Sequence, residues 1–193
     1  MKLGLLLGGI FGVINVSASA DEVKNQGWFA GLGIGASSYE AEESLDTSDT
    51  VLTGFGGYRF NKHLAVQGNV VDLGKYEGDG GVLNSVDLSG FSFTANGILP
   101  LGSNGVELYG RLGLAALKYT QKFDLLGSEL ENSSTGDAIV SSVGFSYTPP
   151  TFQKATFQIE YINYYFETEK TYSDGEAESN NLGVFQVGAK FNF

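Results

Sequence analysis

The sequence is most informative in what it lacks. Among its 193 residues there is no cysteine and only one histidine, His63. Without cysteine the chain has no disulfides and no thiol chemistry. The motifs G-x-S-x-G and H-E-x-x-H are also absent, and a lone histidine beside Lys62 is more typical of a solvated turn than of a catalytic pair. We therefore predict that the protein is not an enzyme and has no catalytic, cofactor-binding or metal-binding residues.

Positive charge and long apolar runs are also scarce. Lys and Arg number 11 against 22 Asp and Glu, so the net charge is −11 and nucleic acid, which requires a basic face, is not an expected partner. After residue 20 no segment approaches the roughly 20 apolar residues that a membrane-spanning helix needs. With three prolines, 28 glycines and 13% aromatic residues, the composition is typical of neither a helical nor a disordered protein.

The first twenty residues have the pattern of a secretory signal. Lys2 provides a positive start, residues 3–16 are apolar, and the small residues at 18–20 have the A-x-A form of a cleavage site. The apolar stretch is too short to span a membrane as a helix. We expect residues 1–20 to be removed on export and residues 21–193 to form one domain.

Eight segments of the remaining chain alternate between apolar and polar residues, with turn signals between them. Such a series predicts an all-β fold in which strands run up and down, each beside the next. The predicted strands cover residues 28–38, 51–60, 64–71, 90–99, 106–119, 138–147, 152–166 and 185–193.

Each segment has one apolar face and one face of polar residues and glycine. On 106–119, for example, Leu112 and Leu114 oppose Arg111. The alternation does not say which face is inside, and in a soluble lipocalin-like carrier the apolar face would line the cavity. Aromatic residues near the predicted strand ends, such as Tyr58 and Phe152, favour a membrane with the apolar face outward. An open sheet edge would leave backbone groups unpaired in hydrocarbon. We therefore predict an eight-stranded antiparallel transmembrane β-barrel.

The connections alternate in length, as they do in barrels with short periplasmic turns and long outer loops. Residues 61–63, 100–105 and 148–151 are short connections, whereas 40–50, 73–85, 120–136 and 167–180 are long. The first and last long connections concentrate acidic residues, which we interpret as solvated outer loops. Weak binding of divalent cations is the less favoured interpretation, because flexible loop carboxylates seldom form a defined site. These acidic residues are Glu40, Glu42, Glu43, Asp46, Asp49, Glu167, Glu169, Asp174, Glu176 and Glu178.

With these elements placed, the chain resembles the small eight-stranded outer-membrane barrels of the OmpA-like and opacity-protein type. The resemblance rests on the sequences at 27–31, 57–61, 72–74 and 108–113, taken in order, and on the C-terminal strand. That strand ends in polar-x-Gly-x-x-Phe-x-Phe, which is similar to the signal by which such barrels are recognised for assembly. The residues of this predicted assembly signal are Gln186, Gly188, Phe191 and Phe193.

By strand phase, a set of polar residues points into the predicted barrel: Gln67, Glu107, Arg111, Gln158, Glu160, Gln186 and Lys190. The resemblance implies that the arginine of the fifth strand and the glutamate of the seventh belong to an interior ion-pair network. We predict that Arg111 pairs with Glu160, and that Glu107 or Glu160 also pairs with Lys190. Eight strands enclose only enough space for side chains, so the interior is expected to be filled and not an open channel.

Together these inferences predict a monomeric, non-enzymatic protein of the Gram-negative outer membrane. The expected partners are outer-membrane lipid and lipopolysaccharide, the barrel-assembly machinery through the C-terminal strand, and a surface ligand or host molecule through the acidic loops. The resemblance implies a role in envelope integrity or in adhesion. The alternative from a different class is a small pore for ions or solutes, and a soluble carrier is the third possibility.

Overall fold

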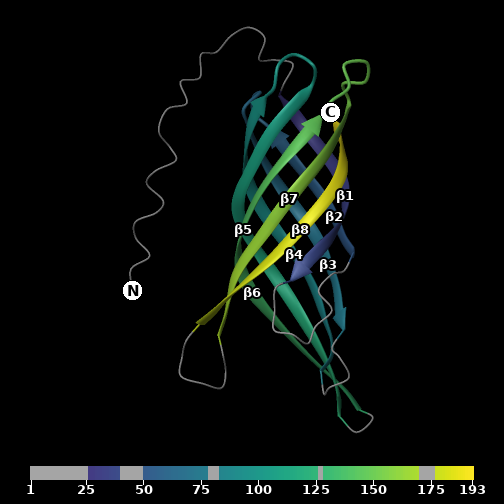
Figure 1. Cartoon of the computed structure of the whole chain (residues 1–193), viewed down its shortest axis with the longest axis vertical. Helices are drawn as coiled ribbons and strands as arrows, with labels where there is room; N and C mark the ends of the chain where they lie inside the picture. Colours follow the sequence, from purple (N-terminus) through teal and green to yellow (C-terminus); the bar gives the residue numbers. More distant parts are fainter. Residues whose placement is uncertain (1–25, 40–49, 78–82, 126–127, 170–176) are drawn as a thin grey trace.

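The chain folds into one closed barrel of eight antiparallel strands, each paired with its neighbour in the sequence and β8 paired with β1 (Figure 1). The structure is a computed structural model and describes residues 26–39, 50–77, 83–125, 128–169 and 177–193. This confirms the predicted fold. The strands are β1 (Gly27–Tyr39), β2 (Thr50–Arg59), β3 (Leu64–Glu77), β4 (Leu83–Pro100), β5 (Val106–Leu125), β6 (Ser128–Tyr147), β7 (Ala155–Glu169) and β8 (Ala177–Asn192).

Short turns close one end of the barrel, and the C terminus lies at that same end (Figure 1). In the β2–β3 turn, the Asn61 side-chain oxygen accepts hydrogen bonds from the backbone N–H groups of His63 and Leu64, at 2.7 and 3.0 Å. Such a turn replaces backbone pairing with a side-chain acceptor and lets the chain reverse within four residues. The β4–β5 turn uses Gly105, whose positive φ of 79° suits glycine.

Long hairpins extend from the opposite end of the barrel (Figure 1). Three of the four long connections are shorter than predicted, because pairing continues well past the predicted strand ends. The β5–β6 ladder runs to the pair Leu125↔Ser128, so most of the predicted loop 120–136 is strand. Sequence analysis assigned these polar segments to loops, whereas they continue the strands beyond the membrane. The predicted signal peptide and the acidic residues between 40 and 49 lie outside the described residues, as do Asp174 and Glu176.

The two faces of the strands have the predicted orientation across the middle of the barrel. Leu112, Phe157 and Phe191 are each half exposed on the outer wall, whereas Arg111 and Glu160 are buried in the interior. A wall of exposed leucine, valine and phenylalanine is stable against acyl chains and not against water. We call this part, from the short turns to the end of the apolar outer face, the bilayer section. No helix among the described residues is long and apolar enough to span a membrane.

Farther toward the long hairpins the outer wall becomes polar and the interior becomes apolar. We call this part the outer section. Its wall begins at exposed polar residues, and an apolar interior residue adjoins each of them in the sequence. Sequence analysis did not predict this interior core. The exposed residues are Asp72, Ser89, Lys118, Asp137 and Asn181, and the adjoining interior residues are Leu73, Leu88, Leu117, Ala138 and Leu182.

The apolar core is continuous from the outer section into the adjacent part of the bilayer section. Its members come from all strands except β1, and several are completely buried. Interdigitated apolar side chains of this kind leave no room for water. The core consists of Val51, Val71, Leu73, Leu88, Ala115, Leu117, Ala138, Val140, Ile162, Tyr164, Phe166, Leu182 and Val184.

Candidate functional site: the polar interior of the barrel

The centre of the bilayer section is organised around an ion pair. The Arg111 Nη2 atom of β5 lies 2.5 Å from Glu160 Oε1 of β7, and both side chains are almost fully buried. The guanidinium also donates from Nε to Ser142 on β6 at 3.1 Å and from Nη1 to Asn69 on β3 at 3.1 Å. Arg111 therefore joins four strands through one rigid group whose charge is neutralised by a carboxylate.

Glutamine residues extend this network around the barrel wall. The second carboxylate oxygen of Glu160, Oε2, accepts a hydrogen bond from Gln186 of β8 at 3.0 Å. The Gln186 carbonyl oxygen in turn accepts from the Thr53 hydroxyl of β2 at 3.1 Å. On the other side, Gln67 donates to Asn69 at 2.6 Å. The predicted residues Gln67, Arg111, Glu160 and Gln186 thus lie in one connected polar layer.

A second ion pair lies nearer the short turns, and its partners differ from those predicted. Arg59 of β2 donates to both carboxylate oxygens of Glu107 of β5, at 2.8 and 3.2 Å. The predicted interaction of Lys190 with Glu107 or Glu160 is not a direct ion pair, since no carboxylate oxygen of the described residues lies within 4.0 Å of its ammonium nitrogen. Lys190 instead places its ammonium group 4.9 Å from the centroid of the Phe29 ring. Arg59 was missed as an interior residue, although it shares strand phase with Thr53 and faces the interior for that reason.

The remaining predicted interior residue, Gln158, is buried on β7. Together with Gln67, Glu107 and Lys190 it lines a small cavity at the short-turn end of the interior, of about 20 Å³. One water needs roughly 10–15 Å³ of such space. Along the axis, the interior therefore passes from this small cavity through the polar layer to the apolar core.

The C-terminal strand contributes to both faces. Gln186 enters the polar layer, while Phe191 and Phe193 lie exposed on the outer wall. Phe191 meets Phe152 edge to face at 6.1 Å, and the Phe193 N–H donates to the Trp28 carbonyl oxygen at 2.9 Å. These rings form part of an aromatic girdle at the short-turn end, as expected where a barrel wall meets the membrane interface.

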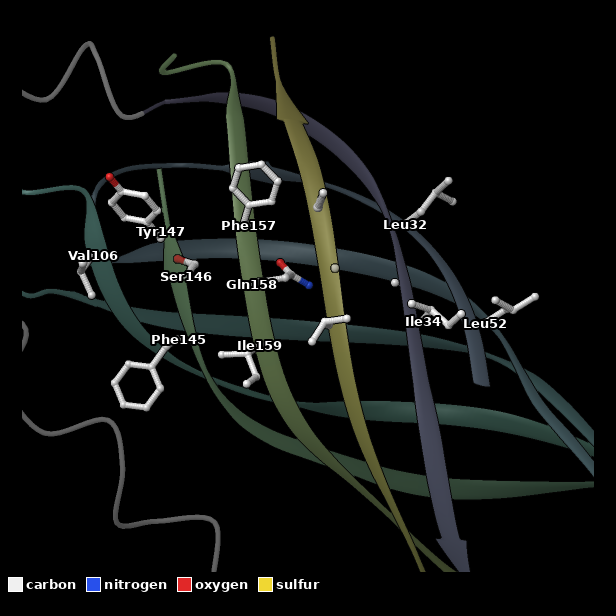
Figure 2. A pocket seen from close by; sticks show the side chains of 14 residues that line it. Leu32, Ile34, Leu52, Val106, Phe145, Ser146, Tyr147, Phe157, Gln158 and Ile159 are labelled. Carbon is white, nitrogen blue, oxygen red and sulfur yellow. The ribbon is translucent and has the colours of Figure 1, made fainter. Parts of the chain in front are cut away.

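The outer wall over β8 is hollowed into an apolar groove (Figure 2). Leu32, Ile34 and Leu52 rise on one side of the groove and Phe157 and Ile159 on the other. Val187 and the small Ala189 of β8 line the groove between these two sides, whereas the Cβ position of Gly188 faces the interior beside Gln158. A Cβ atom there would lie 2.9 Å from the Leu32 carbonyl oxygen, so glycine allows the β8–β1 seam to close.

The described part of the chain contains no cluster of metal-ligating side chains. Within those residues, no group of three or more histidine, cysteine, aspartate or glutamate side chains is placed to hold a metal ion. His63 lies in the β2–β3 turn, where its Nδ1 atom is 3.0 Å from the Ile98 carbonyl oxygen. The chemistry available to the interior is charge pairing and hydrogen bonding.

Comparison with known proteins agrees with this geometry. Residues 5–193 match the model of the family described as outer membrane protein beta-barrel domain. No curated protein sequence matches the chain.

Solved structures with the same fold include three small barrels. Neisserial surface protein A, from Neisseria, is 17% identical, with a TM-score of 0.59 over 86% of this chain and 97% of that one. OprG of Pseudomonas aeruginosa is 15% identical, with a TM-score of 0.54 over 88% and 97%. The attachment invasion locus protein Ail of Yersinia pestis, in complex with the heparin analogue sucrose octasulfate, is 18% identical, with a TM-score of 0.52 over 87% and 99%. From the matched family model, the chain belongs to the outer membrane protein β-barrel domain family, whose members lie in the outer membrane of Gram-negative bacteria.

Proposed function

We propose that the protein is a non-enzymatic surface protein of the outer membrane, in which a sealed barrel carries polar hairpins into the extracellular medium. The observation that supports this most directly is the filled interior. A hydrogen-bonded polar layer and an apolar core lie in series along the axis. A conducting path would have to cross both, and apart from the Tyr164 hydroxyl the side chains of the apolar core offer an ion no polar group to replace its water.

The outer hairpins are the part of the molecule that a ligand can reach. The β5–β6 hairpin continues from the last exposed apolar residue, Ile139, to its tip near Leu125. Exposed polar residues such as Ser133 and Thr135 cover its wall. We infer that this hairpin and the acidic connections around it form the interaction surface, because binding residues gather on loops that a rigid scaffold positions.

Charge indicates the class of ligand. The relative Ail was solved with a sulfated sugar, which is a polyanion. The present chain carries 22 acidic against 11 basic residues, and a surface of that sign repels polyanions. We therefore propose a basic ligand, such as a cationic segment of a host protein, and envelope stabilisation as the role in its absence.

Export and assembly complete the proposal. Residues 1–20 act as a cleaved signal peptide, 21–193 form the barrel as a monomer, and Gln186, Gly188, Phe191 and Phe193 are read by the barrel-assembly machinery. Phe191 belongs to the last strand, Phe193 follows it directly, and both are exposed at the barrel end. Outer-membrane lipid and lipopolysaccharide surround the apolar wall.

The test combines conductance and binding on one sample. The refolded protein in planar bilayers is expected to show no current above background, and vesicles that carry it are expected to bind poly-lysine but not heparin. Deleting residues 120–136, which lie beyond the bilayer section, should reduce poly-lysine binding and leave heat-modifiable gel mobility intact. Steady unitary currents from the intact protein would contradict the proposal and favour the pore. Unchanged poly-lysine binding by the deletion variant would show that this hairpin is not the binding surface.

A further inference from the structure

The small cavity at the short-turn end of the interior is surrounded by more positive than negative groups. Arg59 and Lys190 line it, together with the single carboxylate of Glu107. Both Glu107 oxygens already accept hydrogen bonds from Arg59, and one also accepts from Ser146 at 3.3 Å. The carboxylate is therefore committed to the arginine, and the cavity has a net charge of one positive unit from Lys190.

Lys190 makes no direct ion pair within the part of the chain that the structure describes. No carboxylate oxygen there lies within 4.0 Å of its ammonium nitrogen, which instead lies 4.9 Å from the centre of the Phe29 ring. The ring offers a cation weak compensation. An ammonium group in a narrow interior is stable only when an opposite charge reaches it.

Two further groups that can donate hydrogen bonds line the same cavity, the Gln158 side-chain amide and the Tyr109 hydroxyl. The Tyr109 hydroxyl is buried and has no hydrogen-bond partner among the described residues. Buried polar groups in proteins are nearly always satisfied, so the Tyr109 hydroxyl points to a species that fills the cavity and accepts hydrogen bonds.

We propose that this cavity binds one small monovalent anion of the chloride class, held by the Lys190 ammonium group with the Gln158 amide and the Tyr109 hydroxyl as additional donors. The volume of about 20 Å³ corresponds to room for about one water-sized species, which fits a monatomic ion. A water molecule would satisfy the two neutral donors but would leave the lysine charge uncompensated. The anion site is separate from the outer hairpins and does not depend on the function proposed for them.

The direct test is diffraction from crystals of the full barrel grown with sodium bromide, which has an anomalous signal. The expected result is one bromide peak in the cavity, within hydrogen-bond distance of Lys190 and Gln158. A cavity that holds only a water-like peak with no anomalous signal overturns the proposal, whatever the variants do.

A solution experiment gives a second readout. The midpoint of heat-modifiable mobility is measured in sodium chloride and in sodium gluconate at equal ionic strength, because gluconate is too large for the cavity. Chloride is expected to raise the midpoint of the wild-type protein, as any ligand bound to the folded state does. Lys190→Met is expected to abolish the difference, and Lys118→Met, at an exposed lysine of the outer section, to keep it. An equal chloride effect in Lys190→Met would contradict the assignment.

Discussion

The bilayer section and the outer section are built from the same strands and turn the same strand faces inward, but the polarity of those faces is reversed between them. In the bilayer section Arg111 and Glu160 are inside and Leu112 is outside. In the outer section Leu117 is inside and Lys118 outside, only six residues farther along β5. Along β5 the period of two continues without interruption from Arg111 to Lys118, so the polarity of each face changes while its direction does not.

This difference teaches that the surrounding medium, and not the barrel, decides which face is apolar. Against acyl chains the outer wall must be apolar, and the interior carries polar groups that satisfy one another. Against water the outer wall must be polar, and the interior is then stabilised by apolar packing, as in a soluble domain. The largest measurable consequence is that interior substitutions should act through charge in one section and through packing in the other.

The largest effect is expected from Arg111→Ala. It leaves the buried Glu160 carboxylate without its cation, which costs about 3–5 kcal/mol. The free energy of unfolding can be measured by urea titration in lipid vesicles, with the fluorescence of Trp28, the only tryptophan, as the signal. The double variant Arg111→Met, Glu160→Leu removes both charges and is expected to recover most of the loss. If Arg111→Ala stays within about 1 kcal/mol of wild type, the pair does not organise the bilayer section.

The next effect concerns the outer section, where packing should dominate. Leu182→Ala creates a cavity in the apolar core and is expected to destabilise the barrel by about 2–5 kcal/mol. Its matched control, Leu114→Ala, shortens a leucine on the outer wall, where lipid fills the space, and should cost less than half as much. The same urea titration compares the two. Equal losses would mean that the core contributes no more than the outer wall does.

A charge placed on the outer wall should distinguish the two sections. Leu112→Arg puts a guanidinium against lipid and is expected to cost about 2–4 kcal/mol. Thr135→Arg places the same group on the wall of the outer section, where it meets water, and should change stability by less than about 0.5 kcal/mol. Folding yield into vesicles and urea midpoints report both variants. A tolerated arginine at position 112 would place the bilayer elsewhere.

The smallest effect is expected at the short-turn end. The ion pair of Arg59 and Glu107 is partly exposed, with 17% and 14% of the side chains accessible. Arg59→Met is therefore expected to cost only about 0–1 kcal/mol, because water screens and partly replaces the interaction. The loss should shrink further in high salt. A loss as large as that of Arg111→Ala would show that this end is as dry as the centre.

The sequence predicted the strands of the bilayer section and their faces because the constraints there are local. Near Leu112 and Phe157 every second residue faces lipid and is apolar, so the alternation of the sequence indicates both the strand and its outer face. The apolar interior of the outer section was not predicted, because it does not follow from local alternation alone. Leu73 and Leu117 lie on the interior face, where an apolar residue gives no signal until the position of the membrane boundary is known. Strand pairing beyond that boundary depends on partners far away in the sequence.

Strand phase and resemblance predicted the ion pair of Arg111 with Glu160 but not that of Arg59 with Glu107. Phase placed Arg111, Glu160 and Lys190 in the interior, but the choice of partner depends on strand tilt and on which side chains cross the axis. Arg59 reaches Glu107 across 48 residues of sequence and from a strand that is not its neighbour. The distance between such groups is set by barrel closure and cannot be read from period or spacing.

The most direct test of the inverted polarity uses the absence of cysteine, because single cysteines can be introduced without background. Spin labels at positions 112, 117 and 118 in vesicles would be probed with oxygen, which partitions into lipid, and with a water-soluble nickel chelate. Position 112 is expected to respond to oxygen, position 118 to the chelate, and position 117 to neither. If position 112 responded to the chelate, or position 117 to both reagents, the two sections would not differ as described.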